Sequence, residues 1–312
     1  MIYVVAGPTI VNDICFENGK KISGVLGGSV YCVSGLLFWT ADITYISKVG
    51  PDFSTFYGAW MQSNRVSDHS LIVNLPKTHY SVLQYHSSGR YTEASLYGEE
   101  YENYVYPLSR LTAGDIAQHC SVTTKGIYLE VYENESIWNQ LGLIRRKTGA
   151  PILWEIPSDS VFEPSRRTLT LQRILQASAF SINIPEAAAL FQTSARESLI
   201  RQIRALGRPC FLRAGAEGSY WVSEDGVFFA PSLSLGPPVD PTGCGNASTA
   251  AALYAYAEEL PPAQIPVIGN ISAAFTILQY GPFPELSECH RVKAVNLLRD
   301  SLRKNQNGGK IE

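Results

Sequence analysis

Short apolar runs alternate with stretches of helical periodicity along most of the chain. The runs predict strands at Ile2–Ala6, Ile43–Val49, Ile127–Val131, Pro151–Ile156, Phe180–Ile184 and Pro209–Ala214. The other stretches predict helices at Ser29–Trp39, Phe53–Ser63, Ser136–Lys147, Arg166–Ala179, Glu186–Leu206, Ala247–Leu260, Ile268–Tyr280 and Leu286–Arg303. Strands that alternate with helices form βαβ units, so the pattern predicts an α/β fold with a mostly parallel sheet.

Two segments break this alternation. Ile14–Val25 is centred on Glu17–Lys20, which resembles the tip of a hairpin, and Ser70–Tyr97 shows a period of two with a turn at Ser87–Arg90. Together they predict a small β subdomain inserted into the α/β core. The alternative is a pair of surface hairpins that share no sheet.

Composition narrows the function classes. Of 312 residues, 25 are Lys or Arg and 28 are Asp or Glu, which gives a net charge of −3 and a charged fraction of 17%. Because 45% of the chain is hydrophobic, intrinsic disorder is excluded, and the absence of a basic excess argues against nucleic-acid binding. The low charge indicates a wide layered core or a surface hidden between subunits.

The cysteines and histidines give no metal-binding spacing. Cys15, Cys32, Cys120, Cys210, Cys244 and Cys289 form no C-x-x-C pair, and the five histidines are scattered. Free thiols are typical of a reducing cytosol, and neither a secretory leader nor a window of about 18 apolar residues is present. We therefore expect a cytoplasmic protein without a membrane partner.

The strongest local signal is the segment Asp240-Pro-Thr-Gly-Cys-Gly-Asn-Ala-Ser248, which runs into an alanine-rich helix. Small residues let several backbone N–H groups converge at the positive end of the helix dipole, which is a design for binding an anion. The plain alternative is the glycine-rich start of a packed helix. The segment lacks the Walker A lysine, and Gly243-Cys244-Gly245 is only a truncated dinucleotide fingerprint.

At this segment the chain resembles the ribokinase-like (PfkB) carbohydrate kinases, whose signature is Asp-Thr-x-Gly-Ala-Gly-Asp. Further matching segments follow in the order of that family: Gly7–Asp13, Gly27-Gly28, Lys48–Phe53, Asn183–Ala187 and Ala214–Gly218. Each is weak alone, but six in the right order cover nearly the whole chain.

The resemblance implies a single three-layer α/β/α domain over residues 1–312, with lid insertions at approximately 14–25 and 68–104. It implies transfer of the γ-phosphoryl group of ATP to a hydroxyl of a sugar or nucleoside-like molecule, with Mg²⁺ as cofactor. A monovalent cation near Asp240–Thr242 is a further candidate, since some members depend on one. A homodimer through the lid is also implied.

Site residues follow position by position from the same resemblance. The catalytic turn comprises Gly243, Cys244, Gly245 and Asn246. Nucleotide binding is assigned to Asn183, Glu186, Arg213, Gly215, Gly218, Asp240 and Thr242, with Glu186 near Mg²⁺ through water and Asp240 mainly structural. Acceptor binding is assigned to Asp13, Gly27, Gly28, Tyr31 and Cys32.

The chain departs from the family pattern at the position of the general base. The last residue of the signature is Asn246 in place of aspartate, and an amide cannot take the proton of an attacking hydroxyl. Cys32 replaces an asparagine that often contacts ribose. Arg213 and Glu155 occupy strand ends where either could face the site, although a solvated charge is as good an interpretation.

Two alternatives to an active kinase remain. The first is a binding protein that kept the fold and lost efficient chemistry, which Asn246 and Cys32 favour. The second is a cysteine hydrolase, because Cys244 at a helix N-terminus would have a lowered pKa. No G-x-S-x-G motif and no neighbouring histidine in the sequence support the latter.

Overall fold

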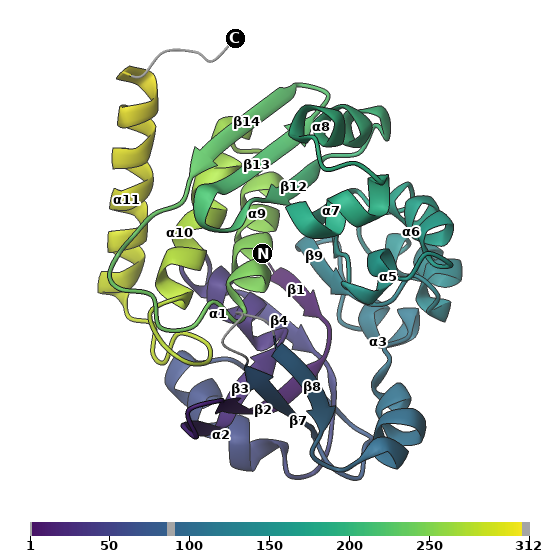
Figure 1. The fold of residues 1–312 in the computed structure, drawn as a ribbon. Helices are drawn as coiled ribbons and strands as arrows, with labels where there is room; N and C mark the ends of the chain where they lie inside the picture. The colour runs from purple at the N-terminus through teal and green to yellow at the C-terminus, as the bar shows by residue number, and fades with distance from the viewer. Residues whose placement is uncertain (1, 86–90, 308–312) are drawn as a thin grey trace.

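The structure, a computed structural model, describes residues 2–85 and 91–307. An eight-stranded sheet forms its centre, in the order β14-β13-β12-β11-β10-β9-β1-β4 (Figure 1). Its strands are β1 (Ile2–Ala6), β4 (Ile43–Ile46), β9 (Thr124–Glu130), β10 (Ile152–Glu155), β11 (Ala179–Asn183), β12 (Cys210–Arg213), β13 (Gly218–Ser223) and β14 (Gly226–Pro231). All pairs from β4 to β12 are parallel, and only β13 and β14 pair antiparallel, which confirms the predicted sheet.

Helices cover both faces of this sheet. They are α1 (Val30–Leu37), α2 (Phe53–Asn64), α3 (Ala113–Ala117), α4 (Leu141–Arg145), α5 (Asp159–Phe162), α6 (Arg167–Ile174), α7 (Ile184–Phe191), α8 (Arg196–Ala205), α9 (Cys244–Ala257), α10 (Ile265–Thr276) and α11 (Glu288–Asn307). Short turns are η1 (Tyr101–Val105), η2 (Tyr106–Ser109), η3 (Ser136–Gln140), η4 (Gly215–Glu217) and η5 (Pro262–Gln264).

Alternate side chains of each parallel strand enter two separate cores. In β9, Ile127 and Leu129 pack with α3 to α8, whereas Tyr128 packs with α1, α2, α9 and α10. Because both faces are covered, the strands read as continuous apolar runs, and this is why the sequence pattern identified them.

The lid is one four-stranded sheet in the order β3-β2-β7-β8, made of β2 (Thr9–Phe16), β3 (Lys21–Gly28), β7 (His79–Tyr85) and β8 (Tyr91–Ser95). The shared sheet rules out the alternative of two separate hairpins. The first lid segment is wider than the expected 14–25, because β2 starts at Thr9, soon after β1 ends. The predicted turn at 87–90 lies outside the described residues.

Several elements differ from the prediction. The single strand expected at 43–49 is divided into β4 and a short β5 (Lys48–Val49), which pairs with β6 (Ile72–Val73) instead of continuing along the main sheet. The long helix expected at 186–206 is two helices, because Gln192 takes a left-handed conformation with φ 54° and ends α7. The stretch 136–147 begins as the 3₁₀ turn η3 before α4.

The antiparallel hairpin β13–β14 was not predicted. β14 is the outermost strand of the sheet, and its exposed side chains alternate with half-buried or buried ones, although residues 227–230 are a continuous apolar run.

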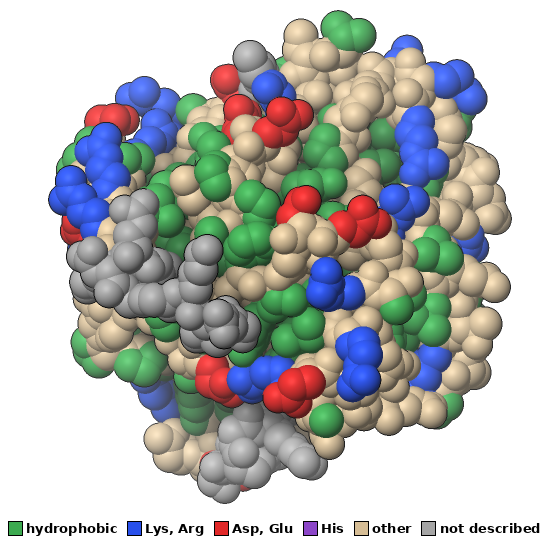
Figure 2. All heavy atoms as spheres, turned by 90° about the horizontal axis from the view of Figure 1, so that it is seen from above, with side chains coloured by type: hydrophobic (Ala, Val, Ile, Leu, Met, Phe, Trp, Pro, Cys, Tyr) green, Lys and Arg blue, Asp and Glu red, His purple; other side chains and the backbone are tan. Residues whose placement is uncertain are grey.

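Within the described parts of the chain no helix combines the length and apolarity needed to cross a bilayer. On the face shown in Figure 2, acidic and basic side chains are interspersed among uncharged groups, without an extended basic patch.

Candidate active site

A cavity of about 800 Å³ lies between the lid and the carboxyl edge of the main sheet. The core contributes Gly7 and Pro8 after β1, Glu130 to Tyr132 at the end of β9, and Pro157 after β10. The lid and the segment after it contribute Ile10, His79, Glu93, Glu102 and Tyr106. Ligands of parallel α/β sheets bind outside the carboxyl ends of the strands, so this cavity has the position expected of an acceptor site.

The predicted phosphate-binding segment forms a tight turn at the start of α9. Gly243 caps the helix with φ 77°, and a Cβ atom there would lie 2.1 Å from the ring of Tyr31. Asp240 Oδ1 accepts hydrogen bonds from Thr242 N (3.0 Å) and Thr242 Oγ1 (2.7 Å), so this carboxylate shapes the turn. The second oxygen of Asp240 is buried and has no hydrogen-bond partner among the described residues.

Asn246, in the first turn of α9, contacts the cavity lining. Its Nδ2 donates to Oε2 of Glu130 at 3.3 Å, and Ser29 Oγ donates to the same oxygen at 2.7 Å. Burial raises the pKa of Glu130. Glu130 was not singled out in the sequence, although an acid that ends an apolar strand at the ligand-binding edge is a signal that could have found it.

Glu155 is buried and Arg213 is half-buried, so of the two interpretations left open for each residue, the solvated charge is excluded for Glu155 and disfavoured for Arg213. The Arg213 guanidinium forms an ion pair with Glu155 and lies 3.6 Å from Glu186 Oε2. Burial raises the pKa of Glu155 to about 7, against the opposing effect of Arg213. The same guanidinium touches the phosphate-binding turn, since a Cβ on Gly245 would lie 2.0 Å from Nη1.

Asn183 and Glu186 form a capping box at the start of α7. Asn183 Oδ1 accepts from Glu186 N, and Glu186 Oε2 accepts from Asn183 N, both at 2.9 Å. Ser158 Oγ donates to Glu186 Oε1 at 2.7 Å. The local sequence Asn-Ile-Pro-Glu thus fixes the carboxylate beside Arg213.

Gly215 and Gly218 meet conformational demands of the turn between β12 and β13. Their φ angles are 59° and 130°, and a Cβ on Gly218 would lie 2.1 Å from the carbonyl oxygen of Ala230. Their nucleotide-binding role stays a prediction.

Asp13 is engaged inside the lid rather than directed to Asn246. Lys21 Nζ lies 2.6 Å from Oδ2, while Tyr80 Oη donates to Oδ1 at 2.7 Å. The preceding Asn12 lies against the glycine pair, because a Cβ on Gly27 would be 2.1 Å from its Nδ2. Asn12, which the sequence interpretation did not name, thus lies beside the glycine pair that was assigned to acceptor binding.

The residues that follow the glycine pair are packed beneath the site. Gly28 adopts φ 69°, and a Cβ there would lie 2.3 Å from the carbonyl oxygen of Pro8. The ring of Tyr31 lies on Gly243, and its buried hydroxyl has no hydrogen-bond partner in the described structure. Cys32 is fully buried, so direct contact with an acceptor would require the site to rearrange.

Cys244 does not have the activated thiol that the hydrolase alternative requires. Burial raises its pKa to about 12, and its Sγ donates to the carbonyl of Ala273. Desolvation outweighs the helix dipole here, so the expected lowering of the pKa is wrong.

The lid is docked on the core next to the phosphate-binding turn. Tyr85 Oη of β7 lies 2.6 Å from Thr242 Oγ1, and Phe16 of β2 packs edge-on against Tyr280. The lid thus lines the cavity and touches the turn at the same time. Pairing of two lids in a dimer stays a prediction.

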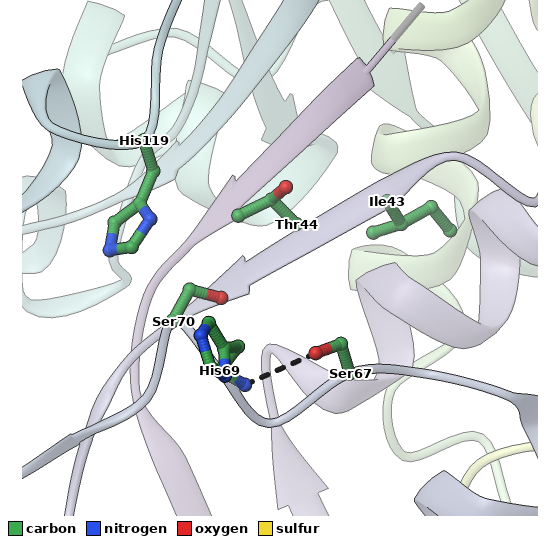
Figure 3. A pocket seen from close by; sticks show the side chains of 6 residues that line it. All are labelled: Ile43, Thr44, Ser67, His69, Ser70 and His119. Atoms are coloured by element: carbon green, nitrogen blue, oxygen red, sulfur yellow. Dashed lines mark hydrogen bonds between the residues drawn. The ribbon is translucent and has the colours of Figure 1, made fainter.

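A smaller cavity of about 130 Å³ lies beside β4, away from this site. Figure 3 shows Ser67, His69 and Ser70 on the loop that follows α2, with Ile43 and Thr44 on β4 and His119 on a separate segment. Throughout residues 2–85 and 91–307, no group of three or more His, Cys, Asp or Glu side chains could hold a metal ion. Two histidines alone give no metal centre.

The sequence model of the pfkB family carbohydrate kinases matches residues 21–288. No curated protein matches the chain.

Solved structures share the fold at low sequence identity. An adenosine kinase from Sinorhizobium meliloti is 18% identical with a TM-score of 0.75, and the match covers 94% of this chain and 98% of that one. The nucleoside kinase of Burkholderia thailandensis in complex with inosine is 15% identical with a TM-score of 0.70, covering 94% and 96%. A nucleoside kinase from Methanocaldococcus jannaschii is 16% identical with a TM-score of 0.70, covering 96% and 98%.

Proposed function

Because this chain belongs to the PfkB family of carbohydrate kinases, we propose that it transfers the γ-phosphoryl group of ATP to a hydroxyl of a sugar or nucleoside-like molecule. One observation carries the proposal. Asn246 joins the phosphate-binding turn to the cavity, since it lies in the first turn of α9 and contacts Glu130 of the cavity wall. A phosphoryl donor on the turn and an acceptor in the cavity would therefore meet at one point.

The turn and Arg213 are suited to the phosphates of the nucleotide. Backbone N–H groups at the start of α9 and the helix dipole favour negative charge. The guanidinium beside Gly245 adds a planar donor of fixed geometry, already held by Glu155 and Glu186. Phosphoryl transfer depends mainly on such positioning and electrostatic stabilisation.

The carboxylates near Arg213 fit Mg²⁺. Glu155 Oε2 is buried without a hydrogen-bond partner in the described structure, and carboxylate oxygens are ligands that Mg²⁺ prefers. Both oxygens of Glu186 already accept hydrogen bonds, which favours contact through water. When bound, Mg²⁺ neutralises charge on the phosphates. Glu155 and Glu186 are the residues that would hold it.

A second candidate function is nucleotide or sugar binding without efficient chemistry. Asn246 replaces the usual base, and the ring of Tyr31 and the guanidinium of Arg213 lie on Gly243 and Gly245. A protein of this kind would act through a partner that senses the bound state.

Steady-state ADP formation from ATP and Mg²⁺ over a panel of sugars and nucleosides tests the proposal. We expect turnover with at least one acceptor and a lower kcat in Asn246→Ala, because the amide no longer orients its neighbours. If the wild type binds ATP but forms no ADP with any acceptor, and Asn246→Asp gains activity, the result would support the binding protein instead. If the wild type has a high kcat and Asn246→Ala has the same kcat, Asn246 does not have the proposed role in the reaction.

A further inference from the structure

A carboxylate from the neighbouring strand lies where the family's usual base is replaced by an amide. We propose that Glu130 is the general base of the reaction and that Asn246 and Ser29 orient its carboxylate. This inference rests on the proposed kinase function. It assigns the proton transfer to a residue on β9 instead of the first turn of α9.

Three donors hold one oxygen of Glu130 and leave the other for an acceptor. Oε2 accepts from Ser29 Oγ at 2.7 Å, from Asn246 Nδ2 at 3.3 Å and from Tyr128 Oη at 3.5 Å. No described residue donates a hydrogen bond to Oε1. Because Glu130 lines the acceptor cavity, this second oxygen is available to a hydroxyl bound there.

The surroundings keep the carboxylate in this place. Ser29 follows the Gly27-Gly28 pair at the N-cap position of α1, but its hydroxyl makes no capping hydrogen bond and donates to Glu130 instead. Gly7 leaves the space for the contact, since a Cβ there would lie 2.1 Å from Ser29 Oγ and 3.0 Å from Glu130 Cβ. A base must lie within hydrogen-bond reach of its proton, and a held carboxylate meets this demand better than a mobile one.

The electrostatics agree with this role. Burial raises the pKa of Glu130, while the hydrogen bonds from Ser29, Asn246 and Tyr128 and the charge of Arg213 oppose the rise. A carboxylate with a raised pKa binds a proton more readily near neutral pH, where an ordinary glutamate is a weak base.

The proposed step is balanced. The acceptor oxygen forms a bond to the γ-phosphorus of ATP, and the bond from that phosphorus to the bridging oxygen breaks. Its electron pair leaves with ADP, and the hydroxyl proton passes to Glu130. Glu130 releases the proton to solvent as the products leave.

The test measures ADP formation with the best acceptor of the panel in four variants. Glu130→Gln removes the base but keeps the shape, and we expect kcat to fall about 10²- to 10⁴-fold with the acceptor KM changed little. Glu130→Gln combined with Asn246→Asp restores a carboxylate on α9, and we expect at least a tenfold recovery. Glu130→Asp keeps the negative charge, but its shorter side chain places the carboxylate further from the acceptor, so we expect an intermediate kcat.

Glu133→Gln is the matched control. Glu133 is a buried carboxylate that accepts from Ser160 Oγ and lies 3.7 Å from Arg166, outside the contacts of Asn246. We expect its kcat to stay within about twofold of the wild type, and melting curves establish that each variant is folded.

Three results would overturn the base assignment. The first is a Glu130→Gln variant as fast as an active wild type. The second is a loss confined to the acceptor KM, and the third is a folded double variant without recovery. If neither the wild type nor Asn246→Asp forms ADP with any acceptor, the proposed kinase function is wrong, and the assignment of Glu130 as general base is wrong with it.

Discussion

Gly243 is the residue of the phosphate-binding turn that contacts the aromatic ring of Tyr31. It caps α9 with φ 77°, a conformation that residues with a side chain rarely adopt, and it leaves no room above Tyr31. The turn therefore depends on this residue for its backbone conformation and for its close approach to α1.

Gly243→Ala tests this dependence. We expect a loss of about 1–3 kcal/mol in the free energy of unfolding, because the left-handed conformation becomes strained and the methyl group meets Tyr31. We also expect weaker ATP binding. Urea denaturation and calorimetric titration with ATP measure the two effects.

Gly149→Ala is its control, since a Cβ there would meet no heavy atom of the described residues within 4 Å. If both variants unfold at the same urea concentration and bind ATP with the same affinity, the turn does not depend on Gly243 for its conformation.

At the scale of elements, the lid connects the acceptor cavity to the phosphate-binding turn. β7 supplies His79 to the cavity wall and Tyr85 to the hydrogen bond with Thr242. Closure of the lid and the shape of the turn are therefore coupled through one strand.

Tyr85→Phe removes the hydroxyl of this contact. One hydrogen bond contributes about 0.5–1.5 kcal/mol, so we expect the acceptor KM to rise about 2- to 10-fold with little change in melting temperature. Steady-state kinetics with the best acceptor give the KM.

Tyr104→Phe serves as the control, because Tyr104 is 76% exposed on the turn η1. An acceptor KM in Tyr85→Phe that equals the KM of this control would show that the contact does not hold the lid closed.

At the scale of the whole molecule, the acceptor cavity concentrates negative charge in a protein whose net charge is only −3. Its lining includes five carboxylates, Glu93, Glu102, Glu130, Glu135 and Asp159, against the two guanidinium groups of Arg110 and Arg166. His79 adds no positive charge near neutral pH, since burial lowers its pKa to about 4.

This charge predicts which acceptors are used. We expect a neutral sugar or nucleoside to have a kcat/KM at least about tenfold above that of its phosphorylated counterpart, because juxtaposed like charges cost several kcal/mol. Competition at constant ionic strength measures the ratio. In the double variant Glu93→Gln/Glu102→Gln, the ratio of the two kcat/KM values should be closer to one. A preference for the phosphorylated acceptor would contradict the charge argument.

The apolar runs predicted the parallel strands because burial on both faces leaves a direct mark in the sequence. The predicted β subdomain also proved to be one sheet, although the sequence left two separate hairpins as an alternative. The edge hairpin β13–β14 was missed although residues 220–222 and 227–230 are apolar, and periodicity could not show that α7 ends at Gln192, where the backbone is left-handed.

The sequence by itself determined the fold class, the turn at Asp240–Asn246 and the amide side chain at position 246, because each depends on residues close together in the chain. Only the tertiary structure decided that Arg213 forms an ion pair with Glu155, that Asp13 pairs with Lys21, and that Glu130 contacts Asn246. The last two residues are 116 positions apart. Periodicity gives the face that a side chain occupies, whereas its partner is set by how strands and helices from distant parts of the chain pack together.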